Sequence, residues 1–429
     1  MLIRFAVENH LSIRDRQELS LVAASIKDTG ANIIPADNME LLPAALIYGA
    51  NASGKSNFIG AFSFLRRVVN SSYSGFEPKS KIARHPFRLD QKSRTLPTKI
   101  DIDFILKGTR YHFGFACTAD AFVEEWLYAF PLGKKQVWYY RDANKRSFQF
   151  GKHLKGSLRT IEKLTRSNSL FLSAAAQNAH EQLTPIFEYL GGFSLSYRIE
   201  NRASDAGTTF SDGSFDKRIL AFLQDADTGV VGHQFEELLK NEAFDQRGFA
   251  TDLLTILKKY SPQGGELPDS IEEIGDLKKI SLGHKAAGKR TEFFDLSLES
   301  AGTLRLLVLL RPVFEALDTG SLVVIDELDA SLHTYICEKI VALFNSRKTN
   351  PRGAQLIATT HDTNLLSAAC VRRDQVWFVE KDNAGASTLY PLTDIRTRGT
   401  ENLEKGYLQG RFGAIPFRGD LTSLLSRSR

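Results

Sequence analysis

Apolar and polar residues alternate in several short stretches of the first half of the chain, a pattern typical of half-buried β-strands. Ile3, Phe5 and Val7 form the first of these stretches. A turn at Lys107 and Gly108 separates two others, which indicates an antiparallel pair. Similar strand character is found at residues 19–21, 100–106, 111–115, 126–140 and 148–150. The first lobe is therefore predicted to be rich in antiparallel sheet.

Asp101 and Asp103 alternate with the apolar residues of one of these strands. Two such carboxylates suggest a metal pair, but the spacing also places both side chains on one face of the strand. We expect that face to be the solvent-facing one, with no metal bound.

Other apolar stretches do not alternate, which favours strands that are buried on both faces. These stretches are residues 41–48, 321–325 and 355–360. The first one leads into residues 57–70, where Phe58, Phe62, Leu65 and Val69 share one face of a predicted helix. The pattern predicts an α/β fold.

Helical spacing dominates the middle of the chain, where glycine residues interrupt it. The expected helices are residues 219–223, 235–239 and 249–260. No heptad repeat is sustained there, so a compact helical insertion is favoured over a coiled-coil arm. We therefore divide the chain into an N-terminal lobe (1–180), a helical insertion (181–298) and a C-terminal lobe (299–429).

The loop after the first buried strand has the sequence GANASGKS at residues 49–56, which matches the phosphate-binding pattern GxxxxGK[ST]. In this pattern, backbone N–H groups and the helix N-terminus surround the phosphates of ATP. Lys55 is expected to reach the terminal phosphates, and the Ser56 hydroxyl to ligate Mg²⁺. The other residues expected to bind ATP in this loop are Gly49, Asn51, Ser53 and Gly54.

The other two buried strands end in polar residues that complete a nucleotide site. Asp326 and Glu327 follow one strand, and His361 follows the other. Ligands bind at the carboxyl edge of open α/β sheets. There Asp326 is expected to hold Mg²⁺ through water, and Glu327 to orient and deprotonate the attacking water. His361 is expected to hydrogen-bond the γ-phosphate.

The composition is that of an ordinary globular chain of 429 residues, 42% of them hydrophobic. A net charge of +5 does not decide between classes of partner. Basic residues concentrate at residues 79–99 and 134–166. These stretches fit either a surface for nucleic acid or an acidic partner, or plain solvated loops.

Three cysteines, Cys117, Cys337 and Cys370, are too widely spaced to indicate a disulfide framework or a zinc site. The first residues carry charges where a signal peptide needs an apolar core, and no apolar run approaches membrane-spanning length. We therefore expect a cytoplasmic protein with no membrane partner.

The segment DELDASLH at residues 326–333 resembles the Walker B motif and D-loop of ATP-binding-cassette (ABC) ATPases. His361 resembles their H-loop histidine, and LESAGT at residues 298–303 resembles their signature motif, although it departs from LSGGQ. The chain start is similar to that of the SMC, RecF and OLD-like branch. This resemblance implies an ABC ATPase head with an antiparallel first lobe and a RecA-like parallel-sheet core.

The same resemblance assigns further residues to the ATP site. It implies that Asp329 contacts ATP, and that Ser300 and Gly302 of one copy contact the ATP bound to another copy. A dimer or higher homo-oligomer follows from this arrangement. Gln177 is either the Q-loop glutamine of this family or an incidental surface amide.

The chain layout is also similar to that of the AAA-type, OLD-like ATPases of bacterial abortive-infection and antiphage operons. The similarity is carried by IYGANASGKSN at residues 47–57, ADTG at 226–229 and GRFGAIP at 410–416. It implies an ATP-driven sensor or scaffold that controls a separate effector, an RloB-type protein or a nuclease.

Three other functions compete with this one. A RecF-like DNA-repair ATPase would bind DNA directly and strongly. The ATPase subunit of a transporter fits the motifs but not the antiparallel first lobe. An OLD nuclease needs a Toprim domain, for which the tail from Glu380 is too short and lacks the required carboxylates.

Overall fold

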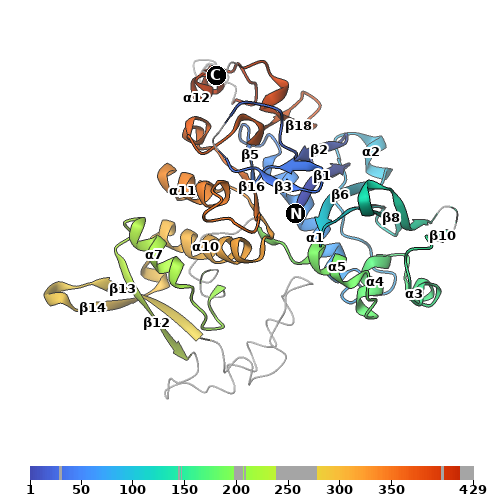
Figure 1. Cartoon of the computed structure of the whole chain (residues 1–429), viewed down its shortest axis with the longest axis horizontal. Coiled ribbons are helices and arrows are strands. Elements are labelled where there is room, and N and C mark those ends of the chain that lie inside the picture. Colours follow the sequence, from blue (N-terminus) through green and yellow to red (C-terminus); the bar gives the residue numbers. More distant parts are fainter. Residues whose placement is uncertain are drawn as a thin grey trace, which may run out of the picture.

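The computed structural model describes residues 1–28, 31–143, 145, 147–197, 206, 209–237, 278–397 and 401–415. Within them, a seven-stranded sheet and a six-stranded sheet share helix α1 between them, and a three-stranded sheet projects to one side (Figure 1). The helices are α1 (Lys55–Ser71), α2 (Gln91–Thr95), α3 (Leu158–Leu164), α4 (Phe171–Gln177), α5 (Thr184–Gly191), α7 (Lys217–Asp225), α10 (Ala301–Thr319), α11 (Thr334–Asn345) and α12 (Leu403–Leu408).

The first-lobe sheet is antiparallel, with its seven strands in the order β10-β9-β8-β7-β6-β1-β2. Its strands are β1 (Leu2–Glu8), β2 (Gln17–Ser20), β6 (Thr98–Leu106), β7 (Thr109–Cys117), β8 (Phe122–Phe130), β9 (Gln136–Asp142) and β10 (Ser147–Phe150). One face packs on α1, where the rings of Phe5 and Phe62 are stacked with centroids 3.7 Å apart. The antiparallel first lobe predicted from the sequence is confirmed.

The prediction that Asp101 and Asp103 face solvent is wrong. Both side chains are buried, and basic side chains of β7, together with that of Arg16 just before β2, cover them. Asp103 lies 3.0 Å from Arg110 Nη2 and 3.0 Å from His112 Nδ1, while Asp101 accepts from Arg16 Nη2 at 3.0 Å. Long cationic side chains can cover a carboxylate on the open face of a sheet, because their apolar stems lie along the surface.

The central sheet has the order β11-β15-β16-β5-β17-β18, and all of its pairings are parallel except that of β17 with β18. Its strands are β5 (Ala44–Tyr48), β11 (Ser194–Ser196), β15 (Leu322–Ile325), β16 (Gln355–Thr359), β17 (Val376–Lys381) and β18 (Ser387–Pro391). Every residue of β5, β15 and β16 is buried, as their unbroken apolar runs predicted.

Helices cover both faces of the central sheet, which explains why its strands do not alternate. Ala45 and Ile47 of β5 belong to the apolar core that contains α1. Leu46 and Tyr48 belong to a second core, which contains α10 and α11. The loop after β5 therefore starts from a strand that is fixed on both sides.

The insertion contains more sheet than its apolar spacing predicted. The helix expected at residues 219–223 is confirmed within α7, whereas Phe235 lies in a strand and is paired with Ile280. A pattern of five residues is too short to distinguish the helical spacing of apolar residues from the alternation of a strand. The three-stranded antiparallel sheet consists of β12 (Val230–Glu237), β13 (Lys278–Lys285) and β14 (Thr291–Asp295). Residues 249–260 lie outside the described part, and the boundaries at 180 and 298 stay predictions.

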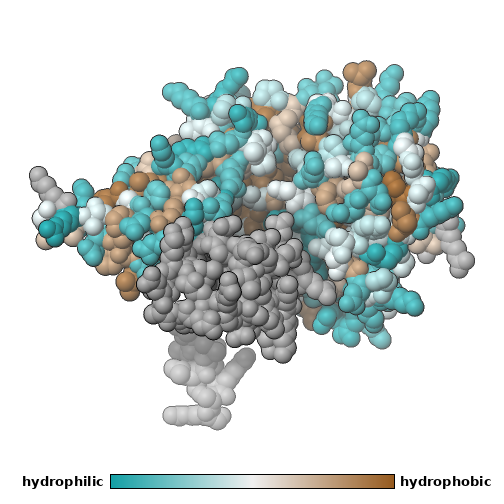
Figure 2. Space-filling model, turned by 90° about the horizontal axis from the view of Figure 1, so that it is seen from below, coloured by the Kyte–Doolittle hydropathy of each residue, from teal (hydrophilic) through white to brown (hydrophobic). Residues whose placement is uncertain are grey.

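A short hairpin of β3 (Ile34–Ala36) and β4 (Met39–Leu41) completes the sheets of the described chain. Side chains on the face shown in Figure 2 are mostly hydrophilic, with apolar ones scattered between them. Among the described residues, no helix combines the length and hydrophobicity needed to cross a bilayer.

Candidate functional site

The loop of residues 49–56 connects β5 to α1 and requires glycine at two positions. A Cβ atom on Gly49 would lie 2.5 Å from the carbonyl oxygen of Val379. Gly54 has φ of 115°, and a Cβ there would lie 2.2 Å from Ser387 Oγ. Neither position accepts a larger residue without a shift of its surroundings, so the backbone can pass close to its neighbours. The loop thereby delivers Lys55 and Ser56 to the first turn of α1.

Lys55 folds back over this loop. Its Nζ donates to the carbonyl oxygens of Gly49 at 2.8 Å and Ala50 at 3.1 Å. Burial lowers the pKa of Lys55 below its ordinary value, and the carboxylate of Asp326 opposes that effect. The ammonium group is therefore held against the loop, where it can exchange its hydrogen bonds to these carbonyls for hydrogen bonds to phosphate oxygens.

The Asp326 carboxylate connects the loop to the two neighbouring strands. Its Oδ1 accepts from Ser56 Oγ at 3.1 Å and from Thr359 Oγ1 at 2.8 Å. Oxygen ligands of this kind suit Mg²⁺, which is usually held by one or two carboxylates together with substrate phosphates. Among the described residues, no group of three or more His, Cys, Asp or Glu could hold a metal. Ser56 and Asp326 are the residues that would hold a magnesium ion, together with the phosphates.

Glu327 points toward the same place from a strained backbone. It has φ of 53°, a left-handed conformation that costs a residue with a side chain about 1–2 kcal/mol. Its N–H donates to Thr359 Oγ1 at 2.7 Å. Its exposed side chain lines a cavity of about 520 Å³ over the loop, together with His361 and Lys381. The position suits a base that acts on a water molecule in this cavity.

His361 lines the same cavity and follows β16 after one residue, Thr360. Its backbone N–H donates to Asp329 Oδ1 at 3.1 Å. Partial burial and the charge of Lys55 lower the pKa of His361 below its ordinary value of 6.5. The imidazole is therefore neutral at pH 7 and has a ring N–H with which to donate a hydrogen bond.

The predicted signature residues lie elsewhere in the same chain. Ser300 caps α10 by accepting from the N–H of Thr303 at 3.1 Å, and Gly302 lies in the first turn of that helix. Neither residue is among the described ones that line the cavity over the loop. The structure of one chain therefore brings together the predicted Walker A, Walker B and H-loop residues, but not the signature.

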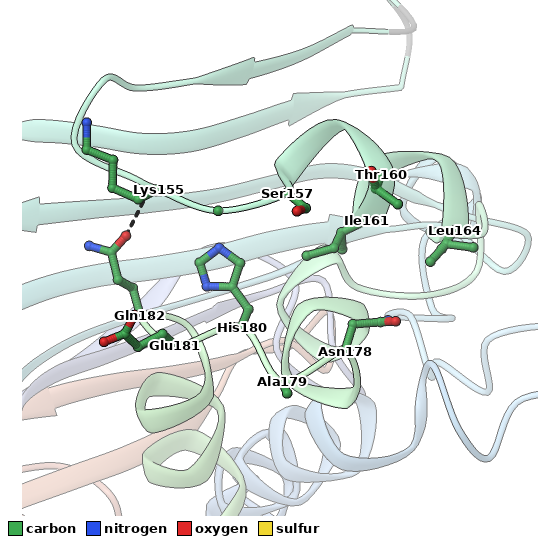
Figure 3. A pocket seen from close by; sticks show the side chains of 11 residues that line it. Lys155, Ser157, Thr160, Ile161, Leu164, Asn178, Ala179, His180, Glu181 and Gln182 are labelled. Atoms are coloured by element: carbon green, nitrogen blue, oxygen red, sulfur yellow. Dashed lines mark hydrogen bonds between the residues drawn. The ribbon is translucent and has the colours of Figure 1, made fainter.

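Gln177 is not brought to the loop either. It is exposed at the end of α4, a helix that begins at the far end of α1, where Ser173 Oγ donates to the Val69 carbonyl at 2.6 Å. The residues that follow it, Asn178 to Gln182, line a different cavity of about 600 Å³ (Figure 3). Its assignment as the Q-loop glutamine stays a prediction.

Two residues of the site were not predicted from the sequence. Thr359 bridges Asp326 and Glu327, and Arg305 of α10 donates to the carbonyl oxygens of both. The available signals were a hydroxyl at the end of an otherwise apolar strand and a lone charge within the apolar run LRLLVLL. Neither signal names the partner of the residue, because the partners are distant in sequence.

A family model described as "AAA domain, putative AbiEii toxin, Type IV TA system" matches residues 44–367. No curated protein matches the chain. Among solved structures, the crystal structure of an SMC head bound to the C-terminal winged-helix domain of ScpA is 14% identical to this chain. That similarity covers 91% of this chain and 96% of the SMC head, with a TM-score of 0.38.

Proposed function

Because the chain belongs to this family of AbiEii-type AAA domains, we propose that it is a Mg²⁺-dependent ATPase that controls a separate effector protein. One observation carries the first half of the proposal. Oδ1 of Asp326 receives hydrogen bonds from Ser56 of the phosphate loop and Thr359 of the strand next to it. This contact holds the hydroxyl and the carboxylate to which we assign Mg²⁺ binding side by side, next to Lys55.

In this proposal, the described residues of one chain bind the phosphates and Mg²⁺ and activate the attacking water. Backbone N–H groups of the loop and the N-terminus of α1 hold the phosphates, and Lys55 turns to the terminal ones. Mg²⁺, when bound, neutralises charge that develops on the phosphate oxygens. Glu327 takes a proton from the water whose oxygen attacks the γ-phosphorus, and the bond to the ADP oxygen breaks. His361 donates a hydrogen bond to the departing phosphate.

The site is completed by a second copy of the chain. Ser300 and Gly302 do not line the cavity of their own chain, and their helix α10 begins with a capped N-terminus that favours anions. In the proposed homo-oligomer, this end of α10 contacts the ATP held by residues 49–56 of the partner. Two copies are then the smallest unit that can turn over ATP.

Control of an effector is the second half of the proposal. The matching family is described by a toxin and a toxin–antitoxin system, and the sequence resembles ATPases of antiphage operons. ATP binding and hydrolysis would move the proposed oligomer between two arrangements, and an effector that binds one of them better would be held or released. The insertion at residues 181–298, with its projecting sheet, is the proposed docking surface.

Direct DNA binding, as in a RecF-like repair ATPase, is the alternative. Several cations of the two basic stretches are engaged within the fold. Arg84 donates to the carbonyls of Arg94 and Leu96, and Arg166 donates to three carbonyls around Tyr73. These contacts favour a structural role for those arginines over an open surface for phosphodiesters.

The effector hypothesis is tested by expressing the chain in its host with and without the gene adjacent to its own. We expect growth arrest or nucleic-acid cleavage to require both genes, and to be altered by Lys55→Ala. Arrest or cleavage caused by this chain alone would contradict the proposal and favour a direct enzyme.

A further inference from the structure

Arg305 joins the helix that carries the signature residues to the backbone that carries the predicted catalytic base. It lies on α10, five residues after Ser300, and only 2% of it is exposed. Its Nη2 donates to the carbonyl oxygen of Asp326 at 2.9 Å and to that of Glu327 at 2.7 Å. A guanidinium group directed at two successive carbonyls fixes the orientation of both peptide units.

Glu327 is consequently held from two sides. Thr359 Oγ1 accepts from its N–H at 2.7 Å, and Arg305 donates to its carbonyl. Its left-handed backbone, with φ of 53°, persists only where the surroundings impose it. Its side chain makes no contribution to this restraint, since both contacts are with the backbone. The carboxylate is thereby aimed into the cavity by atoms outside its own side chain.

A second contact joins α10 to the same loop. A Cβ atom on Gly302 would lie 2.9 Å from the carbonyl oxygen of Ser331, so glycine permits a close approach there. Ser331 is, like Glu327, a non-glycine residue with a left-handed backbone, with φ of 61°. The first two turns of α10 therefore contact both ends of the segment 327–331, through Arg305 at Glu327 and through Gly302 at Ser331.

We propose that Arg305 is a positioning residue, which sets the conformation of Glu327 according to the position of α10. The inference rests on the proposed function, because it assumes that Glu327 activates water and that the start of α10 contacts the partner's ATP. The ATP bound to one copy contacts Ser300 and Gly302 of the other copy. Through Arg305, this contact then changes the conformation of Glu327 in the copy that contributes Ser300 and Gly302. The two composite sites of an oligomer are coupled in this way.

The test compares Arg305→Met and Arg305→Lys with the wild-type chain. Arg311→Met is the matched control, because Arg311 lies on the same helix and pairs with Asp212 and Glu315 at the surface. For each full-length protein we would measure kcat, the Kd for a fluorescent ATP analogue with Mg²⁺, and the thermal unfolding temperature. Misplacement of a catalytic group by about 1 Å costs about 100-fold in rate.

We expect Arg305→Met to lower kcat by about 10- to 100-fold while the Kd changes by less than about threefold. Arg305→Lys, which keeps the charge and an N–H donor, should recover part of the rate, and Arg311→Met should match the wild type. A wild-type kcat in Arg305→Met, or equal losses of kcat and affinity, would overturn the inference.

If Arg305→Met does not fold, Arg305→Lys alone decides: a lowered kcat at unchanged affinity supports the inference, and a wild-type kcat overturns it. Absence of ATP turnover in the folded wild-type chain would instead overturn the proposed function, because the inference requires a rate to lose.

Discussion

Oδ1 of Asp326 accepts hydrogen bonds from two hydroxyls, one in the phosphate loop and one at the end of β16. Thr359→Val removes one of them and also leaves the N–H of Glu327 without its acceptor. An unsatisfied buried donor costs about 1–3 kcal/mol. We expect the variant to unfold at lower urea concentration and to hydrolyse ATP more slowly. Thr388→Val, at an exposed position of β18 in the same sheet, is the control. It should change neither the urea concentration at which the protein unfolds nor the rate of ATP hydrolysis.

We expect Asp103 to make the first lobe sensitive to acid. Burial alone would raise the pKa of Asp103, but the hydrogen bond from His112 and the charges of Arg4 and Arg110 lower it to about 2, from an ordinary 3.8. Because each tenfold change in acidity corresponds to about 1.4 kcal/mol, the ionised carboxylate stabilises the fold by about 2 kcal/mol at neutral pH. This contribution is complete above about pH 4 and is lost as the pH falls toward 2.

Asp103→Asn should therefore lower the free energy of unfolding by about 2 kcal/mol at pH 7. Urea unfolding as a function of pH is the measurement. The gap between variant and wild type should narrow from pH 4 to pH 2. A gap of the same size at both pH values would show that the charge of Asp103 is not what stabilises this lobe.

At the scale of residues, the sequence identified those parts of the site that follow a local motif. Lys55, Ser56, Asp326 and Glu327 each stand at a fixed offset from a glycine loop or a strand end, and the structure places all four around one loop. Thr359 was missed because its role depends on partners more than thirty residues away, which no spacing reveals. The predicted roles of these residues remain to be measured.

At the scale of elements, prediction succeeded where the apolar period was long. Residues 57–70 gave α1, and the pairs around Lys107 gave β6 and β7. It failed at Phe235, because β12 is stabilised by pairing with β13, which is more than forty residues away in the sequence. The spacing of apolar residues within a short segment does not reveal a strand partner that is so distant in the sequence.

The contact between α10 and residues 327–331 predicts that an alanine in place of Gly302 will not stabilise the protein, although alanine normally stabilises a helix. Gly302→Ala should stabilise a helix by about 1 kcal/mol on propensity alone. The new Cβ would, however, lie 2.9 Å from the Ser331 carbonyl oxygen, a backbone atom that can move only with its loop. We expect no gain in thermal unfolding temperature and a lowered kcat.

The control for this variant is Gly232→Ala, because a Cβ at Gly232 meets no heavy atom within 4 Å. It should leave kcat at the wild-type value. If Gly302→Ala raises the unfolding temperature and keeps full activity, α10 does not press on the loop as the structure indicates.

At the scale of the whole molecule, the separation of Ser300 from the cavity predicts a change of mass with nucleotide. Glu327→Gln keeps the loop and Lys55 but removes the proposed base, so ATP should remain bound and hold two or more copies together. Light scattering at micromolar protein should show this assembly with ATP and Mg²⁺. A monomeric mass under the same conditions would rule out the shared site.

The proposed ATPase activity is tested most directly by the rate of phosphate release from ATP, measured for the wild-type chain, Lys55→Ala and Glu327→Gln, with and without Mg²⁺. We expect the wild type to hydrolyse ATP only when Mg²⁺ is present. Lys55→Ala should lose both nucleotide binding and hydrolysis, whereas Glu327→Gln should still bind ATP but not hydrolyse it. Hydrolysis by Glu327→Gln at the wild-type rate would contradict the proposal.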